Sequence, residues 1–483
     1  MSEKVVLAID VGSQSTRAAL VNAGGELLAF AKKPSPPIKR PAPGGFESEA
    51  DAFFDDVLQT ARNALAEAPG SATDVGAVVL CAQRGTTVFC DAHGRPLHPA
   101  VLWCDERHAE DLTPLPFWLR CALPLIRADS VVEQLRRRSP ANRMRHAQSH
   151  VYGSSDRIAL LSSWLVFRLT GRWIDSTASQ VGFVPFDFRR HRWYPPTHWR
   201  WRALALKPSQ LPDLVAPGEV LGPLSASVAD AVGLPRETNV IAAATDKACE
   251  VLGSGAVDPR DEVISLGTAA ALVRPSHRFR HIEPFRPAFP SACPGRYLLE
   301  TQIDCGMARI TALMDSEGLN NRAIEQGWID DTLRTIPAGA GGLRANSTLP
   351  ARFSPSEGIY AQAFDARPDE ITPAAATRAL LEGLALELRQ VHNRFSARFG
   401  APDRVLLGGG GAQSPAFVQL LASVLNRPLR RPVETETGVL GAAMCAAPLV
   451  WSAPSIAHAA TTMSCASTTI NPVPELVRFF DRL

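Results

Sequence analysis

The stretch VIAAATDKACEVLGSGAVDPRDEVISLG, residues 240–267, joins two apolar runs through one acidic residue and a glycine turn. Asp246 follows the apolar run Val240–Ala244 and begins a short predicted helix. The second run, Glu262–Leu266, ends at Gly267-Thr268, a turn whose backbone can approach phosphate oxygens closely. An acid that accepts a proton and a turn that binds phosphate are both parts of a phosphoryl-transfer site. We therefore predict that Asp246 takes a proton from a substrate hydroxyl while glycine turns hold ATP.

The N-terminal residues follow the same plan of strand, polar turn and strand. Val5–Ile9 is a short β-rich run that ends at Asp10, and Gly12 allows the backbone behind it to turn closely. A carboxylate at this strand end is an oxygen ligand of the kind that Mg²⁺ prefers, although an ordinary aspartate-stabilised turn explains the same residues. Because Glu262–Val273 repeats the plan, we expect a duplicated architecture with one phosphate hairpin per half. The hydroxyls that can donate to phosphate at the first hairpin belong to Ser13, Ser15 and Thr16.

Polar residues beside an aromatic follow the buried strand predicted over Val75–Leu80. Gln83 and Arg84 come shortly after this strand, and a hairpin then leads to Trp103 and Asp105 in a loop. A ring face for a carbon skeleton and charged groups for hydroxyls suit a small polyol site. A capped loop around a buried tryptophan explains these residues equally well.

The C-terminal half contains a strand, a glycine run and a helix in succession. Arg404–Leu407 runs into Gly408–Gly411, and a helix is predicted over Ala416–Leu425, which together form a phosphate or nucleoside cradle. The run is not a P-loop, because no Gly-Lys-Ser/Thr follows, and it lacks the third glycine of a dinucleotide fingerprint. Helical spacing also predicts helices over residues 48–68, 125–142, 156–169, 372–399 and 438–447.

The composition argues against some classes of function. Fifty basic and 48 acidic residues give a net charge of +2, and only six of the basic residues are lysines. The arginines are mostly scattered, so no nucleic-acid partner is expected, and the run Arg136–Arg138 is interpreted as a solvated face. Nine cysteines without a Cys-x-x-Cys pair indicate a reducing compartment. With no signal-peptide pattern and no apolar stretch of about 18 residues, we expect a cytoplasmic protein without a membrane partner.

Five segments in this order resemble the FGGY carbohydrate kinase family, which includes xylulokinase, ribulokinase, gluconokinase and glycerol kinase. They are AIDVGSQSTRAAL, the QRGTTV…PAVLWCDER block, LTGRWIDSTAS, the Asp246 stretch with SLGT, and LLGGGGAQSPAFVQLLASVLNRPL with GVLGAAMCAA. The resemblance implies an α/β chain of two actin-like (ribonuclease H-like) ATPase domains with an interdomain cleft that binds ATP. It divides the chain into an N-terminal domain over 1–243, a C-terminal domain over 244–450 and a peripheral tail over 451–483.

The same resemblance implies a role for individual residues. Asp246 is the catalytic base and contacts the substrate, and Asp10 is associated with Mg²⁺. The remaining substrate-binding positions are Gln83, Arg84, Trp103 and Asp105. The nucleotide-binding positions are Asp10, Gly12, Ser13, Gln14, Ser15 and Thr16 at the first hairpin, Gly267 and Thr268 at the second, and Gly409, Gly410, Ser414 and Phe417 on the adenosine side.

The implied function is an ATP- and Mg²⁺-dependent kinase that phosphorylates a terminal hydroxyl of a small sugar. A ketopentose such as xylulose or ribulose is favoured, because the Trp103-x-Asp105-x-Arg107 pattern is common among pentulose kinases. Glycerol, another polyol or gluconate is the alternative. Arg84 can meet a carboxylate such as that of gluconate, whereas Gly85 stands where glycerol kinases have the glutamate that binds the glycerol hydroxyls. An actin-fold ATP-binding sugar sensor without useful transfer is a second alternative, and family analogy makes a homodimer possible.

Two departures from the family pattern leave local questions open. Thr245 stands where a glycine often precedes the base, and a β-branched residue cannot easily adopt positive φ. Lys247 directly follows the base, where it either binds phosphate or lies on the surface of the helix.

Overall fold

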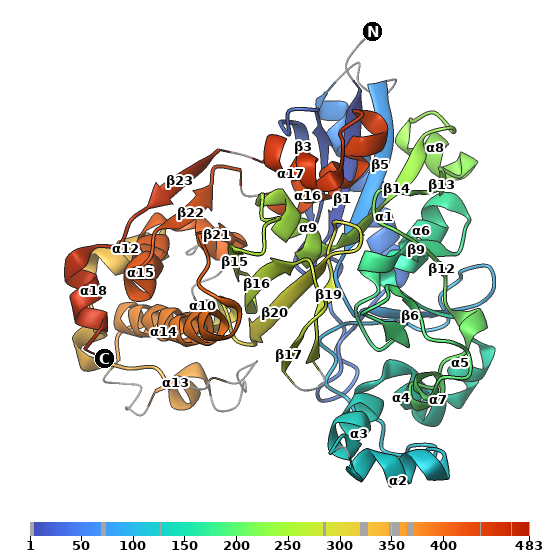
Figure 1. Cartoon of the computed structure of the whole chain (residues 1–483), viewed down its shortest axis with the longest axis horizontal. Coiled ribbons are helices and arrows are strands. Elements are labelled where there is room, and N and C mark those ends of the chain that lie inside the picture. The colour runs from blue at the N-terminus through green and yellow to red at the C-terminus, as the bar shows by residue number, and fades with distance from the viewer. Residues whose placement is uncertain are drawn as a thin grey trace. The chain divides into compact units, whose positions relative to one another are not determined.

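The computed structural model shows an α/β chain that divides into two compact units (Figure 1). Unit 1 comprises Met1–Gly255, Arg278–Tyr297 and Gly438–Ser464, and unit 2 comprises Ala256–His277, Leu298–Thr437 and Cys465–Leu483. Asp246 therefore lies in unit 1, whereas the predicted division at residue 244 assigns it to the C-terminal domain. The residues that the structure describes are 4–68, 74–125, 127–283, 286–318, 327–346, 349, 358–364, 371–434, 436–464 and 466–482.

Unit 1 is built on a six-stranded sheet with the strand order β13-β14-β5-β1-β2-β3. Strand β1 pairs antiparallel with β2 and parallel with β5, which pairs parallel with β14. These central strands consist largely of Val, Ala, Leu and Ile, as expected where both faces are covered. Helix α1 (Ala50–Glu67) packs on the sheet through Phe53 and Val57. The strands are β1 (Val5–Val11), β2 (Ser15–Val21), β3 (Leu27–Pro34), β5 (Val75–Ala82), β13 (Val220–Pro223) and β14 (Asn239–Thr245).

A smaller four-stranded sheet in unit 1 has the order β4-β7-β6-β8. The helix predicted over residues 156–169 is wrong in its first turn, because Arg157–Leu160 forms β8 and pairs with β6 before α6 begins. The helix predicted over residues 125–142 is interrupted at Ser139, which caps a new helix beginning with Pro140. The strands are β4 (Glu47–Ser48), β6 (Thr87–Cys90), β7 (Ala100–Val101) and β8 (Arg157–Leu160).

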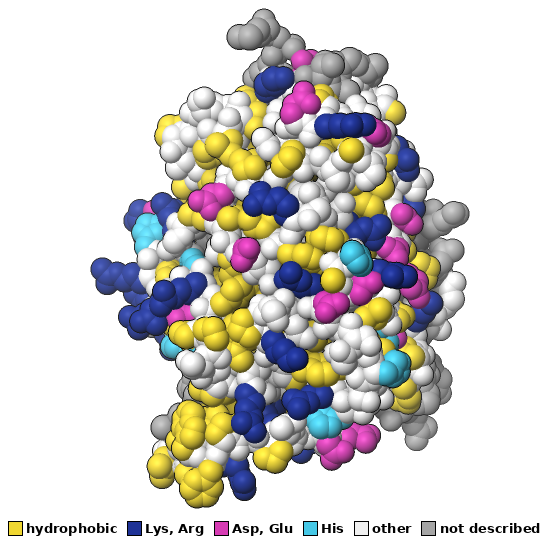
Figure 2. Space-filling view, turned by 90° about the vertical axis from the view of Figure 1, so that its right-hand side faces the viewer, with side chains coloured by type: hydrophobic (Ala, Val, Ile, Leu, Met, Phe, Trp, Pro, Cys, Tyr) yellow, Lys and Arg dark blue, Asp and Glu magenta, His cyan; other side chains and the backbone are white. Residues whose placement is uncertain are grey.

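The other helices of unit 1 surround these sheets. Helix α2 carries the exposed apolar side chains Phe117, Trp118 and Leu125. The Lys and Arg side chains on the face shown in Figure 2 are interspersed with acidic and apolar ones. The helices are α2 (Phe117–Leu125), α3 (Asp129–Arg138), α4 (Pro140–Ala147), α5 (Ser149–Ser154), α6 (Leu161–Thr170), α7 (Trp199–Ala203), α8 (Ala226–Val232), α9 (Asp246–Gly253), α16 (Thr437–Val450) and α17 (Ile456–Thr462).

Unit 2 repeats the plan of the unit 1 sheet. Its strands follow the order β20-β16-β15-β21-β22-β23, in which β15 pairs antiparallel with β16 and parallel with β21. The duplicated strand–turn–strand arrangement predicted from the sequence is therefore confirmed. The strands are β15 (Asp261–Leu266), β16 (Ala270–Ser276), β20 (Tyr297–Ile303), β21 (Arg404–Gly408), β22 (Leu429–Pro432) and β23 (Ser467–Ile470).

The end of the chain is part of the unit 2 core and not the peripheral tail that was expected. Strand β23 pairs antiparallel with β22, and Phe480 of α18 is fully buried beside α14 and α15. Thr372 caps the long helix α14, as its polar side chain predicts. The helices of unit 2 are α10 (Ala308–Ser316), α12 (Trp328–Thr335), α13 (Gly358–Ala363), α14 (Pro373–Phe399), α15 (Pro415–Leu425) and α18 (Pro474–Phe480).

Two further features concern the cysteines and the length of the helices. The eight cysteines within the described part of the chain are all free thiols. Among the same residues, no helix is both long enough and apolar enough to cross a bilayer. The short strands are β9 (Ile174–Ser176), β10 (Phe186–Asp187), β11 (Arg192–Trp193), β12 (Asp213–Val215), β17 (His281–Glu283), β18 (Arg286–Pro287) and β19 (Phe289–Pro290).

Candidate active site

Asp246 is the first residue of helix α9, directly after strand β14. Thr245 has extended backbone angles, φ −65° and ψ 158°, and its hydroxyl accepts a hydrogen bond from the Ala248 N–H at 3.3 Å. The threonine is therefore a helix N-cap, and the positive φ of the glycine it replaces is not needed here. The helix begins sharply enough to hold the Asp246 carboxylate at the end of the sheet.

The electrostatic surroundings of Asp246 favour a proton acceptor. Removal from water raises the pKa of the Asp246 carboxyl, and the positive charges of Arg84 and Lys247 partly oppose this effect. The Lys247 N–H donates to Asp246 Oδ1 at 2.7 Å, while the Lys247 ammonium pairs with Glu250 at 2.5 Å. A carboxylate with a raised pKa is a stronger base than an exposed one, which suits general-base catalysis.

Asp10 lies in the central strand β1, opposite Cys81 of β5 and Arg17 of β2. Its carboxylate accepts from Arg17 Nη1 at 3.0 Å and from the Cys81 thiol at 3.4 Å. Burial raises the pKa of Asp10 to about 7, with Arg17 opposing the shift and the charge of Asp246 adding to it. The structure thus brings together two acids that are 236 positions apart in the sequence.

The turn behind Asp10 forms a tight hairpin, closed by a hydrogen bond from the Gly12 N–H to the Ser15 carbonyl at 3.1 Å. The hydroxyls of Ser15 and Thr16 are buried and have no hydrogen-bond partner within the described residues. The Asp10 carboxylate is an oxygen ligand of the kind that Mg²⁺ prefers. Ser15 lies two residues from Arg17, the residue paired with Asp10, and is therefore on the same face of the hairpin, whereas Thr16 pairs with Val11 and lies on the opposite face.

The first hairpin is connected directly to the predicted sugar side of the site. Trp103 Nε1 donates to Ser13 Oγ at 2.9 Å, and the Ser13 hydroxyl donates to Gln83 Oε1 at 3.5 Å. The indole is 40% exposed, so its ring can still contact a ligand. The Arg84 guanidinium lies 5.5 Å from the ring centre of Phe289, a cation–π contact that sequence reasoning missed.

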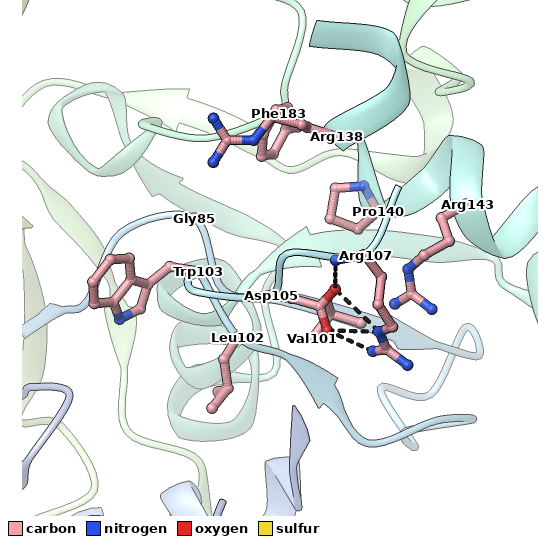
Figure 3. Close-up of a pocket in the computed structure, with 10 residues that line it drawn as sticks. All are labelled: Gly85, Val101, Leu102, Trp103, Asp105, Arg107, Arg138, Pro140, Arg143 and Phe183. Atoms are coloured by element: carbon pink, nitrogen blue, oxygen red, sulfur yellow. Dashed lines mark hydrogen bonds and ion pairs between the residues drawn. The ribbon is translucent and has the colours of Figure 1, made fainter. Parts of the chain in front are cut away.

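Asp105, predicted to bind substrate, has its carboxylate oxygens engaged within unit 1. Arg107 Nε and Nη2 donate to Asp105 Oδ2 at 3.0 and 2.5 Å, and the Phe46 N–H donates to the same oxygen at 2.9 Å. Arg107 Nη2 also bonds Glu47 at 2.5 Å. The Asp105 side chain is 5% exposed and fixes the loop after Trp103 (Figure 3). Its carboxylate thus orders this loop, and its contact with substrate stays a prediction.

Two arginines that sequence reasoning missed lie beside this loop. Arg138 ends α3, and Arg143 lies on α4 and is 6% exposed; together with Trp103 and Gly85 they line a pocket (Figure 3). The predicted solvated face is wrong for Arg136, which is buried and donates to the Thr113 carbonyl. A helix break at Ser139-Pro140 was the only sequence signal for this arrangement.

The second hairpin, at Gly267 and Thr268 in unit 2, is covered by the start of α10. The Thr268 carbonyl accepts hydrogen bonds from the Gly306 N–H at 2.9 Å and the Ala308 N–H at 3.1 Å. The Gly267 carbonyl accepts a hydrogen bond from the Met307 N–H at 2.9 Å. A Cβ on Gly306 would lie 2.7 Å from the Ala269 carbonyl carbon, so only glycine fits this crossing. The carbonyls of this turn are therefore already satisfied, and phosphate binding by its backbone N–H groups stays a prediction.

The glycine run after β21 has one strained and one open position. Gly409 has φ +78°, and a Cβ there would lie 2.7 Å from the Leu266 carbonyl carbon, whereas a Cβ on Gly410 would meet no atom of the described residues within 4 Å. The open space at Gly410 is consistent with close approach of a ligand to the backbone.

The N-terminus of α15 differs from the predicted cradle. Asp330 of α12 accepts from the Ala416 N–H at 2.7 Å and from the Ser414 hydroxyl at 3.0 Å, so a carboxylate of the chain itself occupies the position expected for phosphate. Ser414 also caps the helix by accepting from the Phe417 N–H. The predicted contact from Phe417 needs correction, because its side chain is fully buried in the unit 2 core.

Comparisons with known proteins agree with this architecture. The chain is 26% identical over 483 residues to a glycerol kinase from Nocardia farcinica, covering 92% of this chain and 89% of that protein. The fold is similar to a xylulose kinase from Brucella ovis, with a TM-score of 0.79, 21% identity and coverage of 99% and 96%. It is equally similar to a gluconate kinase from Lactobacillus acidophilus, with a TM-score of 0.78, 19% identity and coverage of 100% and 96%.

The family models cover almost the whole chain. The N-terminal domain model of the FGGY family of carbohydrate kinases matches residues 5–253, and the C-terminal domain model matches residues 263–449. The first match includes the Asp10 hairpin and Asp246, and the second includes the Gly267 hairpin and the Gly409 run. The chain therefore belongs to the FGGY family of carbohydrate kinases.

Proposed function

We propose that the protein transfers the γ-phosphoryl group of ATP to a terminal hydroxyl of a small linear sugar, with Asp246 as the general base. Kinases of the family use ATP with Mg²⁺. The observation that supports this role is the placement of Asp246 at the start of α9, where burial raises its pKa next to the Arg84 cation.

The proposed reaction needs one proton acceptor and a set of groups that bind charge. The acceptor hydroxyl oxygen forms a bond to Pγ while the bond between Pγ and the oxygen of ADP breaks, and the hydroxyl proton passes to the Asp246 carboxylate. Arg84 donates to a hydroxyl of the sugar, and Trp103 offers its exposed ring to the carbon skeleton. Gln83, which already accepts from Ser13, orients the same end of the site.

The residue that would hold Mg²⁺ is Asp10, with the Ser15 hydroxyl on the same face of the hairpin. The ion, when bound, neutralises charge on the phosphate oxygens. Because the pKa of Asp10 is about 7, the carboxyl is only partly ionised near neutral pH, and cation binding favours its ionised form.

Contacts to the nucleotide are proposed separately for each unit. In unit 1, the backbone and side chains of the first hairpin bind phosphate through Gly12, Ser13, Gln14, Ser15 and Thr16. In unit 2, Gly267 and Thr268 bind phosphate. Gly409 and Gly410 contact the adenosine part of the nucleotide. Ser414 contributes by shaping the start of α15.

A ketopentose such as xylulose or ribulose is the first substrate proposed, from the Trp103-x-Asp105-x-Arg107 pattern. Similarity to kinases of glycerol, xylulose and gluconate supports a small linear acceptor without choosing among them. A sugar sensor that binds ATP without useful transfer is the competing function, and a general base facing a polyol site argues against it.

The test is ADP release with xylulose, ribulose, glycerol, erythritol and gluconate, combined with Asp246→Asn. The variant should bind ATP normally and lose turnover by about 10²–10⁴-fold. Asp230→Asn, at an exposed acid on α8, is the matched control and should keep full activity. Near-native turnover of Asp246→Asn would reject the base assignment, and no stimulation by any sugar would favour the sensor.

A further inference from the structure

Arg309, the second residue of α10, is a fully buried cation in unit 2 to which sequence reasoning assigned no role. Its Nε donates to the Cys305 carbonyl at 2.9 Å and to the Gly306 carbonyl at 3.2 Å, and its Nη2 donates to the Cys305 carbonyl as well. On the other side, its Nη1 donates to Glu387 Oε1 of α14 at 3.0 Å. Helix α10 packs against α14 (Figure 1), and the guanidinium joins α14 to the residues that begin α10.

These residues, 305–308, are called the cover segment, because they contact both parts of the predicted nucleotide site of unit 2. Their N–H groups donate to the carbonyls of Gly267 and Thr268 in the hairpin. The Met307 side chain lies against the glycine run, since a Cβ on Gly411 would be 3.0 Å from Met307 Sδ. The cover segment therefore sets the position of the turn and of the run together.

An arginine at this position is costly for the fold. A cation in the first turn of a helix opposes the helix dipole, and burial removes it from water. Glu387 compensates the charge, yet apolar residues of similar volume often serve stability as well as a buried ion pair does. An apolar side chain cannot hold the Cys305 and Gly306 carbonyls, whereas a guanidinium presents several donors in a rigid fork. The feature specific to Arg309 is thus its grip on the cover segment.

We infer that Arg309 is a positioning residue for nucleotide binding by unit 2, acting through the cover segment on the Gly267 hairpin and the glycine run. The inference rests on the proposed kinase function. Backbone N–H groups bind phosphate best when the surrounding structure holds them in place before the ligand arrives. Arg309 therefore acts on the affinity for ATP and ADP. It does not act on the acceptor, whose predicted contacts lie in unit 1.

The test measures ADP binding in the presence of Mg²⁺ by calorimetry. Arg309→Met keeps an apolar chain of similar length and removes every donor. It should raise the Kd for ADP by about 10–100-fold, the effect of losing one or two charge-assisted hydrogen bonds to phosphate. The KM for ATP should rise in the same way. The KM for the acceptor that the sugar panel identifies should change by less than about threefold.

Arg378→Met is the matched control for a purely structural effect. Arg378 is also buried in unit 2, where it pairs with Glu382 at 2.8 Å and donates to the Leu333 and Ile336 carbonyls at the end of α12. The Glu382 side chain is 7% exposed and that of Glu387 is 20% exposed, so Arg378→Met should lose at least as much thermal stability as Arg309→Met. Its Kd for ADP should stay within about threefold of the native value. An equal loss of ADP affinity in both variants would overturn the inference.

Two milder variants keep the inference testable if Arg309→Met does not fold. Arg309→Lys keeps the charge that faces Glu387 but not the fork, so it should retain only part of the ADP affinity. Glu387→Gln keeps the shape of a half-buried side chain and weakens the hold on the guanidinium, which should raise the Kd for ADP by about three- to tenfold. A native Kd in both of these variants would refute the positioning role.

The binding assay also separates this inference from the proposed function. If the native protein binds ADP and no sugar stimulates turnover, the kinase proposal fails, and the comparison of Arg309→Met with Arg378→Met still decides the role of Arg309. If the native protein binds no ADP, unit 2 has no nucleotide for Arg309 to position, and the inference is overturned.

Discussion

The two hairpins of this kinase share one topology and differ in chemistry. In each sheet a central strand pairs antiparallel with the next strand and parallel with a later one. Two positions before the hairpin glycine, β1 has Asp10 and β15 has Ser265. The unit 1 hairpin has buried hydroxyls that find no partner in the described part of the chain, whereas the carbonyls of the unit 2 hairpin are satisfied by the start of α10.

The difference shows that a repeated fold does not require repeated function. Both acids assigned to catalysis and the ion, Asp246 and Asp10, lie in unit 1. Unit 2 keeps the tight turns that suit a nucleotide, with the close crossing at Gly306 and the positive φ of Gly409. We therefore expect substitutions in the two hairpins to have different consequences.

The largest difference in activity is expected between variants at Asp10 and Ser265, the equivalent positions at the ends of β1 and β15. Asp10→Asn removes the carboxylate that would hold Mg²⁺ and should lower kcat/KM by about 10²–10³-fold, with a raised Mg²⁺ requirement. Ser265→Ala should change kcat/KM by less than about threefold, because it removes no charge. Steady-state kinetics over a Mg²⁺ titration measures both, and similar losses in the two variants would contradict the functional division.

Gly306→Ala should destabilise the cover of the unit 2 hairpin. The new Cβ would lie 2.8 Å from the Gly267 carbonyl oxygen, so the start of α10 must move, at a cost of about 1–3 kcal/mol in the free energy of unfolding. Gly410→Ala is the matched control, since its Cβ would meet no atom within 4 Å among the residues that the structure describes. Chemical denaturation measures both, and equal stability of the two variants would argue against the close packing.

Removal of the α9 cap should have a moderate effect. Thr245→Ala deletes the hydroxyl that accepts from the Ala248 N–H and should cost about 1 kcal/mol of stability. Thr245→Ser keeps the oxygen and should retain most of the stability. A thermal unfolding experiment separates the two variants, and equal loss in both would show that the methyl group, and not the cap, matters.

The smallest expected effect is on pH dependence. Lys247 is one of the cations that lower the pKa of Asp246 against the effect of burial. In the proposed mechanism Asp246 acts as a carboxylate, so activity should fall as pH drops through its pKa, and Lys247→Gln should move this acid limb to higher pH by about half a unit. The pH profile of kcat/KM measures the shift, with Lys207→Gln as a control. A limb that moves to lower pH would refute the sign.

Much of the fold and part of the site could be predicted from the sequence. Asp246 at a helix start and the two strand–turn–strand hairpins follow from apolar periodicity and glycine placement, which are local properties. The same local signals failed at Arg157–Leu160, where pairing with β6 makes a strand of residues with helical spacing. They also could not show that Thr245 caps α9 in an extended conformation.

Only the tertiary structure shows which polar side chains are already bonded to other residues of the chain. Asp105 is engaged by Arg107 and Phe46, and Asp330 occupies the start of α15, because folding brings in partners from distant segments. Arg143 lines the pocket from a helix that begins well beyond Trp103 in sequence. The sequence by itself determined the family and the two strand–turn–strand hairpins, and it placed Asp246 at the start of a helix. Hydrogen-bond occupancy and burial, which depend on long-range packing, were decided only by the three-dimensional structure.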